Sequence, residues 1–135
     1  MAALNGKWKL TEVQGFSEYM DAIGVSGDNK EKGLKMLMPE NDIVQEIAID
    51  DEDVSIKTIT PLSTMDQKAK LNTEIDVNAL DGRPMKATFK FDGEKLVEEQ
   101  KGSFESVNVR FVQDGMLIMS QTANGVTSTR KYTKV

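Results

Sequence analysis

The chain contains neither cysteine nor histidine among its 135 residues. Without cysteine there is no disulfide framework and no thiol nucleophile, and a reducing, cytosolic compartment is favoured. Without histidine the commonest general base is missing and, with no thiolate either, so are the usual zinc ligands. An enzyme would have to work with hydroxyl, amine and carboxylate groups alone. We therefore expect no catalytic residue, no bound metal and no cofactor.

Long apolar runs and an excess of positive charge are also absent. The longest apolar run, at residues 116–119, has four residues, far fewer than the roughly 18 that span a bilayer. The first ten residues lack the charged and then apolar layout of a secretory signal. The net charge of −5 disfavours nucleic acid as a partner. Residues 1–135 are expected to form one globular, monomeric, cytoplasmic domain, with the nucleus open as a second location.

Short extended segments with regular turn signals dominate the sequence. Asx-Gly pairs tolerate positive φ and favour tight hairpins, and four of the pairs in this sequence, at residues 81–82, 92–93, 114–115 and 124–125, mark turns. They indicate strands at 84–91, 94–101, 104–112, 116–121 and 126–133. Earlier strands are expected at "GKWKLTEV" near the start, on each side of residues 50–51, at 65–70 and at 73–78. So much sheet in a short chain predicts an all-β, ten-stranded antiparallel up-and-down β-barrel, because closure removes exposed edges.

The segment between the first two strands has helical spacing instead. Its first apolar face has the pattern i, i+3, i+4, i+7 and consists of Phe16, Tyr19, Met20 and Ile23. Asp28 and Glu31 resemble a capping box that begins a second short helix, which Pro39 would stop. That helix is expected to turn Leu34 and Leu37 or Met38 inward. The pattern predicts a helix-turn-helix lid over about residues 16–38, covering the mouth of the barrel.

The last strand ends in "STRKYTKV", and its alternation separates two unlike faces. Ser128, Arg130 and Tyr132 share one face, whereas Lys131 and the threonines share the other, which has the character of a solvent face. The pattern therefore favours an inward Arg130. The strand "SVNVRFV" places Arg110 with Asn108, but alternation alone leaves open whether that face is inside or outside.

Four stretches in this order resemble the intracellular lipid-binding proteins, the fatty-acid-binding protein family, over essentially the whole length. They are "GKWKLTEVQGFSEYMDAIGV", "LDGRPMKATFKFDGEKLVEEQK", "VRFVQDGMLIMSQT" and "STRKYTKV". The resemblance implies a barrel of two near-orthogonal sheets that holds one long-chain fatty acid or similar lipid. Arg130 and Tyr132 would contact its carboxylate, and Arg110 would reach it directly or through a water. Arg110 and Asn108 would then face inward into a cavity that is partly wet.

The resemblance also implies a lining for the lipid tail. The lid and portal would be lined by Phe16, Met20, Val25, Leu34 and Leu62, and the cavity by Asn108, Leu117, Met119 and Gln121. Ordinary packing of amphipathic helices explains each lid residue equally well. Leu62, Gln121 and Gly102 depart from the family's usual residues, which affects the shape and length of the ligand and leaves the carboxylate site intact.

Two alternatives remain open at this stage. Retinoic acid or another hydrophobic anion would satisfy the same carboxylate site. The lid could also make transient contact with a membrane or a nuclear receptor through Lys30, Lys32 and Lys35, although a solvated helix face explains these lysines as well.

Overall fold

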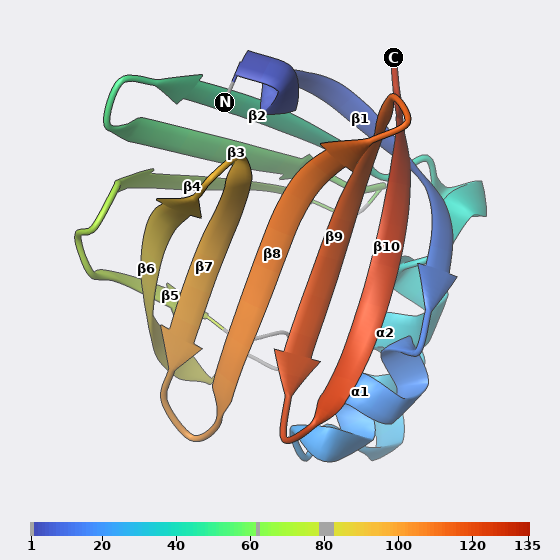
Figure 1. Ribbon diagram of the computed structural model, residues 1–135. Coiled ribbons are helices and arrows are strands. Elements are labelled where there is room, and N and C mark those ends of the chain that lie inside the picture. The colour runs from blue at the N-terminus through green and yellow to red at the C-terminus, as the bar shows by residue number, and fades with distance from the viewer. Residues whose placement is uncertain (1, 62, 79–82) are drawn as a thin grey trace.

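The computed structural model describes residues 2–61, 63–78 and 83–135. These residues form one antiparallel sheet of ten strands, in the order β4-β3-β2-β1-β10-β9-β8-β7-β6-β5, which curls into a nearly closed barrel (Figure 1). The strands are β1 (Gly6–Gln14), β2 (Val44–Asp50), β3 (Asp53–Ile59), β4 (Thr64–Lys70), β5 (Ile75–Asn78), β6 (Pro84–Asp92), β7 (Lys95–Lys101), β8 (Glu105–Gln113), β9 (Met116–Ala123) and β10 (Val126–Lys134). The predicted up-and-down barrel is confirmed.

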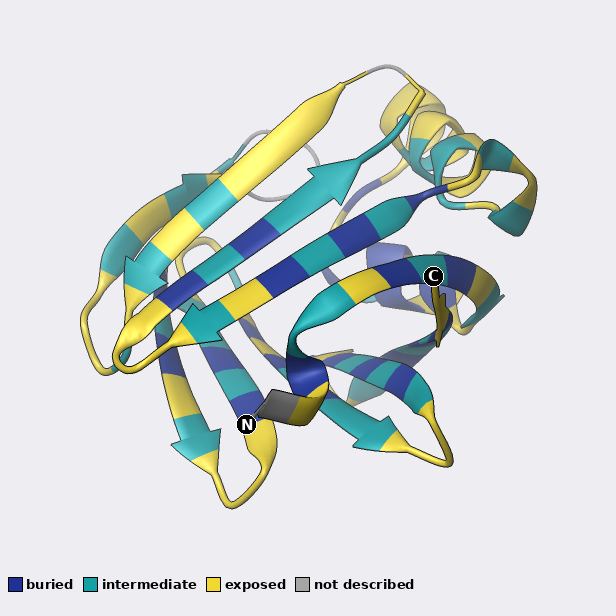
Figure 2. Ribbon diagram, turned by 90° about the horizontal axis from the view of Figure 1, so that it is seen from above, coloured by how far each residue is buried: buried dark blue, intermediate teal, exposed yellow. Residues whose placement is uncertain are grey.

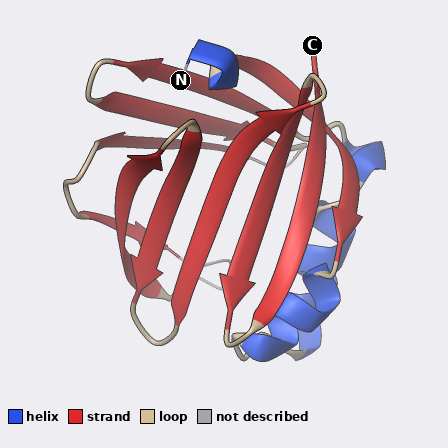
Figure 3. Ribbon diagram, in the orientation of Figure 1, coloured by secondary structure: helices blue, strands red, loops and turns tan. Residues whose placement is uncertain are grey.

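Helical segments lie at both ends of the barrel (Figure 3). They are α1 (Phe16–Ala22), α2 (Gly27–Met36) and two short 3-10 helices, η1 (Ala2–Leu4) and η2 (Pro39–Asn41). The predicted pair of lid helices is therefore confirmed. Among the residues that the structure describes, no helix is long and apolar enough to cross a membrane.

The hairpin turns explain how the strands reverse so tightly. Asp114 and Asn124 adopt φ values of 54° and 51°, and the glycine after each also has positive φ. Positive φ at both central residues gives the turn whose twist matches the flanking strands. The first of the four predicted Asx-Gly pairs, at residues 81–82, lies outside the described residues.

Burial alternates along strands such as β6 and β10, and Figure 2 shows dark and lighter bands following one another along several strands. The main apolar cluster includes Trp8, Phe89, Leu96 and Leu117. At the end of the barrel away from the lid, Leu4 of η1 is buried, and its carbonyl accepts a hydrogen bond of 2.9 Å from the Trp8 indole. The Asn5 side chain exchanges two hydrogen bonds with the Ile49 backbone. These contacts fix η1 across that end of the barrel.

The α1 helix closes the other end by packing on β9 and β10. Phe16, Tyr19 and Met20 are its buried residues, as its apolar spacing predicts. Arg83 holds the end of the helix, because its guanidinium donates a hydrogen bond of 2.7 Å to the Ile23 carbonyl and lies 4.8 Å above the Phe104 ring. These two contacts connect Arg83 to the end of the lid helix and to Phe104.

The α2 helix differs from the prediction in its start and its face. It begins at Gly27 with Ser26 as N-cap, so Asp28 lies in the first turn and the predicted capping box is wrong. The prediction that Leu34 points inward is also wrong, because Leu34 is exposed, as is Met38. A Cβ at Gly33 would lie 3.1 Å from the Met20 sulfur. The helix therefore approaches α1 with its glycine, and this rotates Leu34 towards solvent.

Replacing Gly15 by alanine should lower the free energy of unfolding by about 1–3 kcal/mol. Gly15 is the N-cap residue of α1 and has φ 70°, and a Cβ there would lie 2.8 Å from the Thr127 carbonyl oxygen, a backbone atom that cannot rotate away. Denaturant unfolding measures the loss. Gly93→Ala is the matched control, since Gly93 has φ 62° but no atom within 4 Å of its Cβ position. Equal losses in the two variants would show that the contact with β10 contributes nothing.

Candidate functional site

The inner faces of β8, β9 and β10 carry polar side chains in register. Arg110 pairs with Met119, and Met119 pairs with Arg130, so the two arginines flank one methionine across three strands. The neighbouring row, two residues along each strand, contains Asn108, Gln121 and Ser128. All of these side chains are buried. The structure thereby resolves the orientation of Arg110, which alternation left open: it faces the interior.

Arg130 is a buried cation with neutral partners. Only 7% of the residue is exposed. Its Nη2 donates a hydrogen bond of 2.6 Å to Gln121 Oε1, and its Nη1 lies 3.9 Å from the Met119 sulfur. Its Nε has no hydrogen-bond partner among the described residues. The Phe16 ring lies 5.2 Å from the guanidinium. Among the described residues, no carboxylate lies within ion-pair distance, so the charge of Arg130 has no counterion from the protein.

Tyr132 lies two residues further along β10, on the same face as Arg130. It is fully buried, and its hydroxyl has no hydrogen-bond partner in the part of the chain that the structure describes. Buried hydroxyl groups normally have a partner, and an unsatisfied one costs about 1–3 kcal/mol. An unpartnered hydroxyl beside an unpaired guanidinium is an arrangement suited to an anionic oxygen.

A buried carboxylate, Glu98 of β7, neutralises Arg110. Its Oε1 lies 3.3 Å from Arg110 Nη1, and the exposed fractions of the Arg110 and Glu98 side chains are only 4% and 2%. Asn108 also donates to Oε1, at 3.3 Å, while Gln67 and Gln100 donate to Oε2 at 3.2 and 2.6 Å. The two interior arginines are therefore inequivalent, since Arg110 has an internal counterion.

Sequence reasoning missed Glu98. The stretch "KLVEEQK" does contain a signal, because Leu96 and Glu98 alternate onto one face of β7 and Glu99 onto the other. Since Leu96 must be buried, one of the two adjacent glutamates has to face inward with it. A glutamate on an inward face requires a buried partner, and the neighbouring strand supplies Arg110.

The lid helix joins this polar interior directly. The Tyr19 and Ser106 hydroxyls share a hydrogen bond of 2.7 Å, and Ser106 in turn donates to Asn108 Oδ1 at 3.4 Å. Burial raises the pKa of the Tyr19 hydroxyl above its usual value, while the hydrogen bond with Ser106 and the charge of Arg130 oppose the rise. Tyr19 is therefore neutral at pH 7 and ties α1 to β8.

The described residues form the walls of two pockets that bear on the interior. One, of about 660 Å³, lies under the lid and is lined by residues of α1, α2 and the turn after β3. The other, of about 510 Å³, lies where the edges of β4 and β5 face each other, and Gln67 and Gln100 are in its wall. Met65 lines both pockets. Gln67 and Gln100 therefore line the second pocket and also donate hydrogen bonds to Glu98.

The predicted lining residues fall into three groups. Met20 and Val25 line the pocket under the lid, whereas Leu34 is exposed and does not. Asn108, Leu117, Met119 and Gln121 are buried on the inner face, and Phe16 is buried against Arg130. Leu62 lies outside the described residues.

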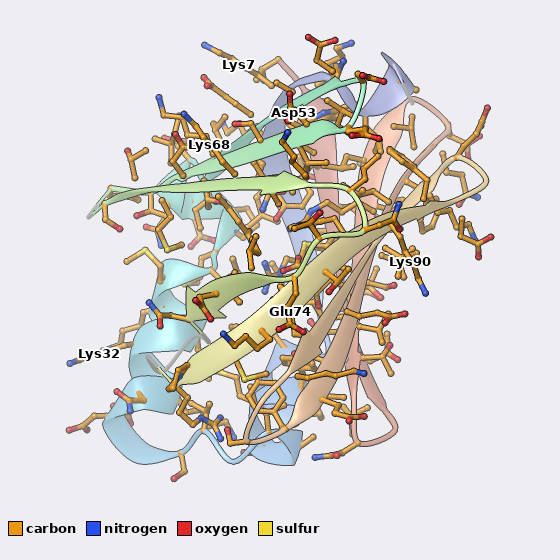
Figure 4. All side chains as sticks on the ribbon, turned by 90° about the vertical axis from the view of Figure 1, so that its left-hand side faces the viewer. Lys7, Lys32, Asp53, Lys68, Glu74 and Lys90 are labelled. Carbon is orange, nitrogen blue, oxygen red and sulfur yellow. The ribbon has the colours of Figure 1, made fainter. Side chains whose placement is uncertain are left out.

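The three lid lysines have different surroundings. Lys30 forms an ion pair of 2.7 Å with Asp21. Lys32 and Lys35 belong to the wall of the pocket under the lid, and Figure 4 shows the Lys32 side chain extending from α2 towards solvent. The lysines therefore do not form one uniform free surface.

A nearly closed antiparallel barrel with a helical lid and buried cations on its inner face defines a ligand-binding β-barrel. The chain belongs to the lipocalin / cytosolic fatty-acid binding protein family, whose model matches residues 1–135. It is 39% identical to sodium/calcium exchanger regulatory protein 1 of Doryteuthis pealeii, over 99% of this chain and 98% of that protein. It is 35% identical to fatty acid-binding protein 5 of Bos taurus, over 98% and 95% of the two chains.

A solved structure shares the same fold. The REP1-NXSQ fatty acid transporter superposes with a TM-score of 0.90 at 37% identity, over 100% of this chain and 98% of that chain. The likeness therefore extends over the lid as well as the barrel.

Proposed function

We propose that the protein is an intracellular carrier that reversibly binds one long-chain fatty acid inside the barrel. The observation that carries this proposal is the buried guanidinium of Arg130 beside the hydroxyl of Tyr132, which have no counterion and no hydrogen-bond partner, respectively, among the described residues. A fatty acid supplies one carboxylate, which is ionised at pH 7 and is costly to bury alone. Relatives and a similar structure named for fatty acid binding or transport support the same ligand class.

Arg130 and Tyr132 would hold the carboxylate from β10. Charge-assisted hydrogen bonds are roughly twice as strong as neutral ones, and a guanidinium stays charged at all relevant pH values. Arg110 would reach the carboxylate directly or through a water with the nitrogens that Glu98 does not bind. Because Glu98 neutralises Arg110, Arg130 supplies the charge that attracts the ligand.

The tail would run from Met119 and Leu117 past Phe16 to the pocket under the lid, where Met20 and Val25 lie. Each buried methylene contributes roughly 0.8 kcal/mol, so a chain of about fourteen supplies roughly 10 kcal/mol before losses. The tail would supply most of the affinity, and the arginine and tyrosine would orient the head group.

Arg130→Gln should weaken the binding of oleate by tenfold or more, because it removes a cation that no described carboxylate of the protein neutralises. Titration of delipidated protein with oleate measures the dissociation constant and the number of sites, expected to be one. Lys131→Gln is the matched control: it removes the same charge from the next residue of β10, whose ammonium lies outside the barrel 3.3 Å from Glu12. If both variants bind oleate as tightly as the unchanged protein, the carboxylate site is wrong.

Tyr132→Phe should weaken oleate binding by about tenfold, the worth of one hydrogen bond to a charged group. It should raise the free energy of unfolding of the delipidated protein by up to about 1–3 kcal/mol, because phenylalanine removes a buried hydroxyl that no described group of the protein bonds. The two readouts are calorimetric titration and denaturant unfolding. A large loss of stability with unchanged affinity would assign the hydroxyl to structure instead.

Retinoic acid carries the same head group on a stiffer tail. Competition between oleate and retinoic acid for the single site compares the two tails directly. Displacement of oleate by a stoichiometric amount of retinoic acid would identify the protein as a retinoid carrier of the same fold.

A further inference from the structure

The charges buried inside the barrel sum to a small positive value. Among the described residues, the buried charged side chains are Glu98, Arg110 and Arg130, with charges of −1, +1 and +1 and a sum of +1. Uncompensated buried charge is costly, so the interior is complementary to a ligand that carries one negative charge. Without Glu98 the sum would be +2.

Glu98 is held firmly in the position that produces this balance. Four donors bind its carboxylate: Arg110 and Asn108 on one oxygen, and Gln67 and Gln100 on the other. Such a set of charge-assisted hydrogen bonds fixes the position of the Glu98 side chain. The ligand therefore meets Arg110 as part of a neutral pair, and Arg130 as a cation.

The pair also lies close to the proposed head-group site. Asn108, which donates to Glu98, is the register partner of Gln121, which accepts from Arg130. Two amide side chains thus separate the carboxylate of Glu98 from the guanidinium of Arg130. An additional negative charge at the head group would be repelled by Glu98 and would find no further free cation among the described interior residues.

We propose that Glu98 is a specificity-determining residue that restricts the interior to head groups with a single negative charge, such as a carboxylate, and excludes those with two, such as a phosphate monoester. This inference rests on the proposed function, because it takes Arg130 and Tyr132 as the head-group site. The site would then select amphiphiles by the number of negative charges on the head group, and an acidic head group alone would not be sufficient.

Dodecyl sulfate and dodecyl phosphate provide the test, since they share tail length and a tetrahedral head group. At pH 8 the sulfate carries one charge, whereas the phosphate monoester, with a second pKa near 6, carries close to two. Calorimetric titration below the micellar concentration should give at least tenfold tighter binding of the sulfate by the unchanged protein. Equal affinity for the two ligands would overturn the proposal from this measurement alone.

Glu98→Gln should reduce that preference to less than about threefold, or reverse it, because the amide keeps the shape of the side chain and removes its charge. Glu99→Gln is the matched control on the same strand: Glu99 lies on the outside of the barrel, paired with Lys90 at 2.6 Å. The control should leave the preference unchanged. Far-UV circular dichroism verifies that each variant keeps its β-sheet.

The double variant Glu98→Gln, Arg110→Gln returns the buried charge to +1 and should recover the tenfold preference for the sulfate. It also keeps the test decisive if Glu98→Gln alone fails to fold, because a double variant that binds both ligands equally would overturn the proposal.

Arg130→Gln distinguishes a failure of the proposed head-group site from a failure of the proposed role of Glu98. If it weakens dodecyl sulfate tenfold while Glu98→Gln keeps the original preference, the head-group site stands and the role of Glu98 is overturned. If Arg130→Gln leaves the affinity for dodecyl sulfate unchanged, the proposed function fails and this inference fails with it.

Discussion

Arg110→Gln should lower the free energy of unfolding by about 3–5 kcal/mol, the usual cost of removing one partner from a buried ion pair. The Glu98 carboxylate would remain almost fully buried, with only amide donors from Asn108, Gln67 and Gln100. Amides satisfy its lone pairs but do not neutralise its charge. Denaturant unfolding at neutral pH measures the loss.

The double variant with Glu98→Gln should recover most of that loss, since two neutral amides then replace two charges. Lys90→Gln is the surface control: it breaks the pair of Lys90 with Glu99, whose side chains are 46% and 39% exposed. Figure 4 shows Lys90 on the outer side of the barrel. That variant should lose less than about 1 kcal/mol. A double variant no more stable than Arg110→Gln would show that the buried pair is not what the single variant disrupts.

Phe89→Ala should also lower the free energy of unfolding by about 3–5 kcal/mol, because it removes a fully buried ring and leaves a cavity. Phe89 is 0% exposed on β6, where it pairs with Glu98 of β7 and packs in the main apolar cluster. We expect the loss in denaturant unfolding to exceed the loss from apolar transfer alone.

Phe111→Ala removes the same ring from the outer face of β8, where Phe111 is half-buried and lies 5.0 Å from the Lys95 ammonium. Partial burial and the cation–π contact predict a loss of about 1 kcal/mol. Similar losses for Phe89→Ala and Phe111→Ala would mean that the inner cluster is no better packed than the surface.

The barrel could be predicted from the sequence because its determinants are local. Pairs such as Asn124-Gly125 fix the hairpins through their own φ values, and alternation on the last strand places Arg130 inside. The start and face of α2 could not be predicted, because they depend on the close approach of Gly33 to Met20. The periodicity of apolar residues in one helix does not reveal which residues of a neighbouring helix will pack against it.

The candidate site could be predicted only in part, for a similar reason. Arg130 and Tyr132 are two residues apart on one strand, so the alternation along that strand predicts that both side chains lie on the same face. The Glu98–Arg110 pair joins two strands and receives hydrogen bonds from Gln67, a residue of a third. Whether a polar side chain on a strand points inward depends on such partners, and alternation alone cannot identify them.

The place where β4 and β5 end the sheet has a mechanical consequence. In the described residues no backbone ladder joins these two strands, and the side chain of Gln67 on β4 reaches Glu98 on β7 beyond the opening. The barrel is therefore open between β4 and β5. Its circumference can change at this opening through the loss of side-chain contacts, without the loss of any backbone hydrogen bond between strands. Amides on the two facing edges should exchange with solvent hydrogen before those of β8 to β10.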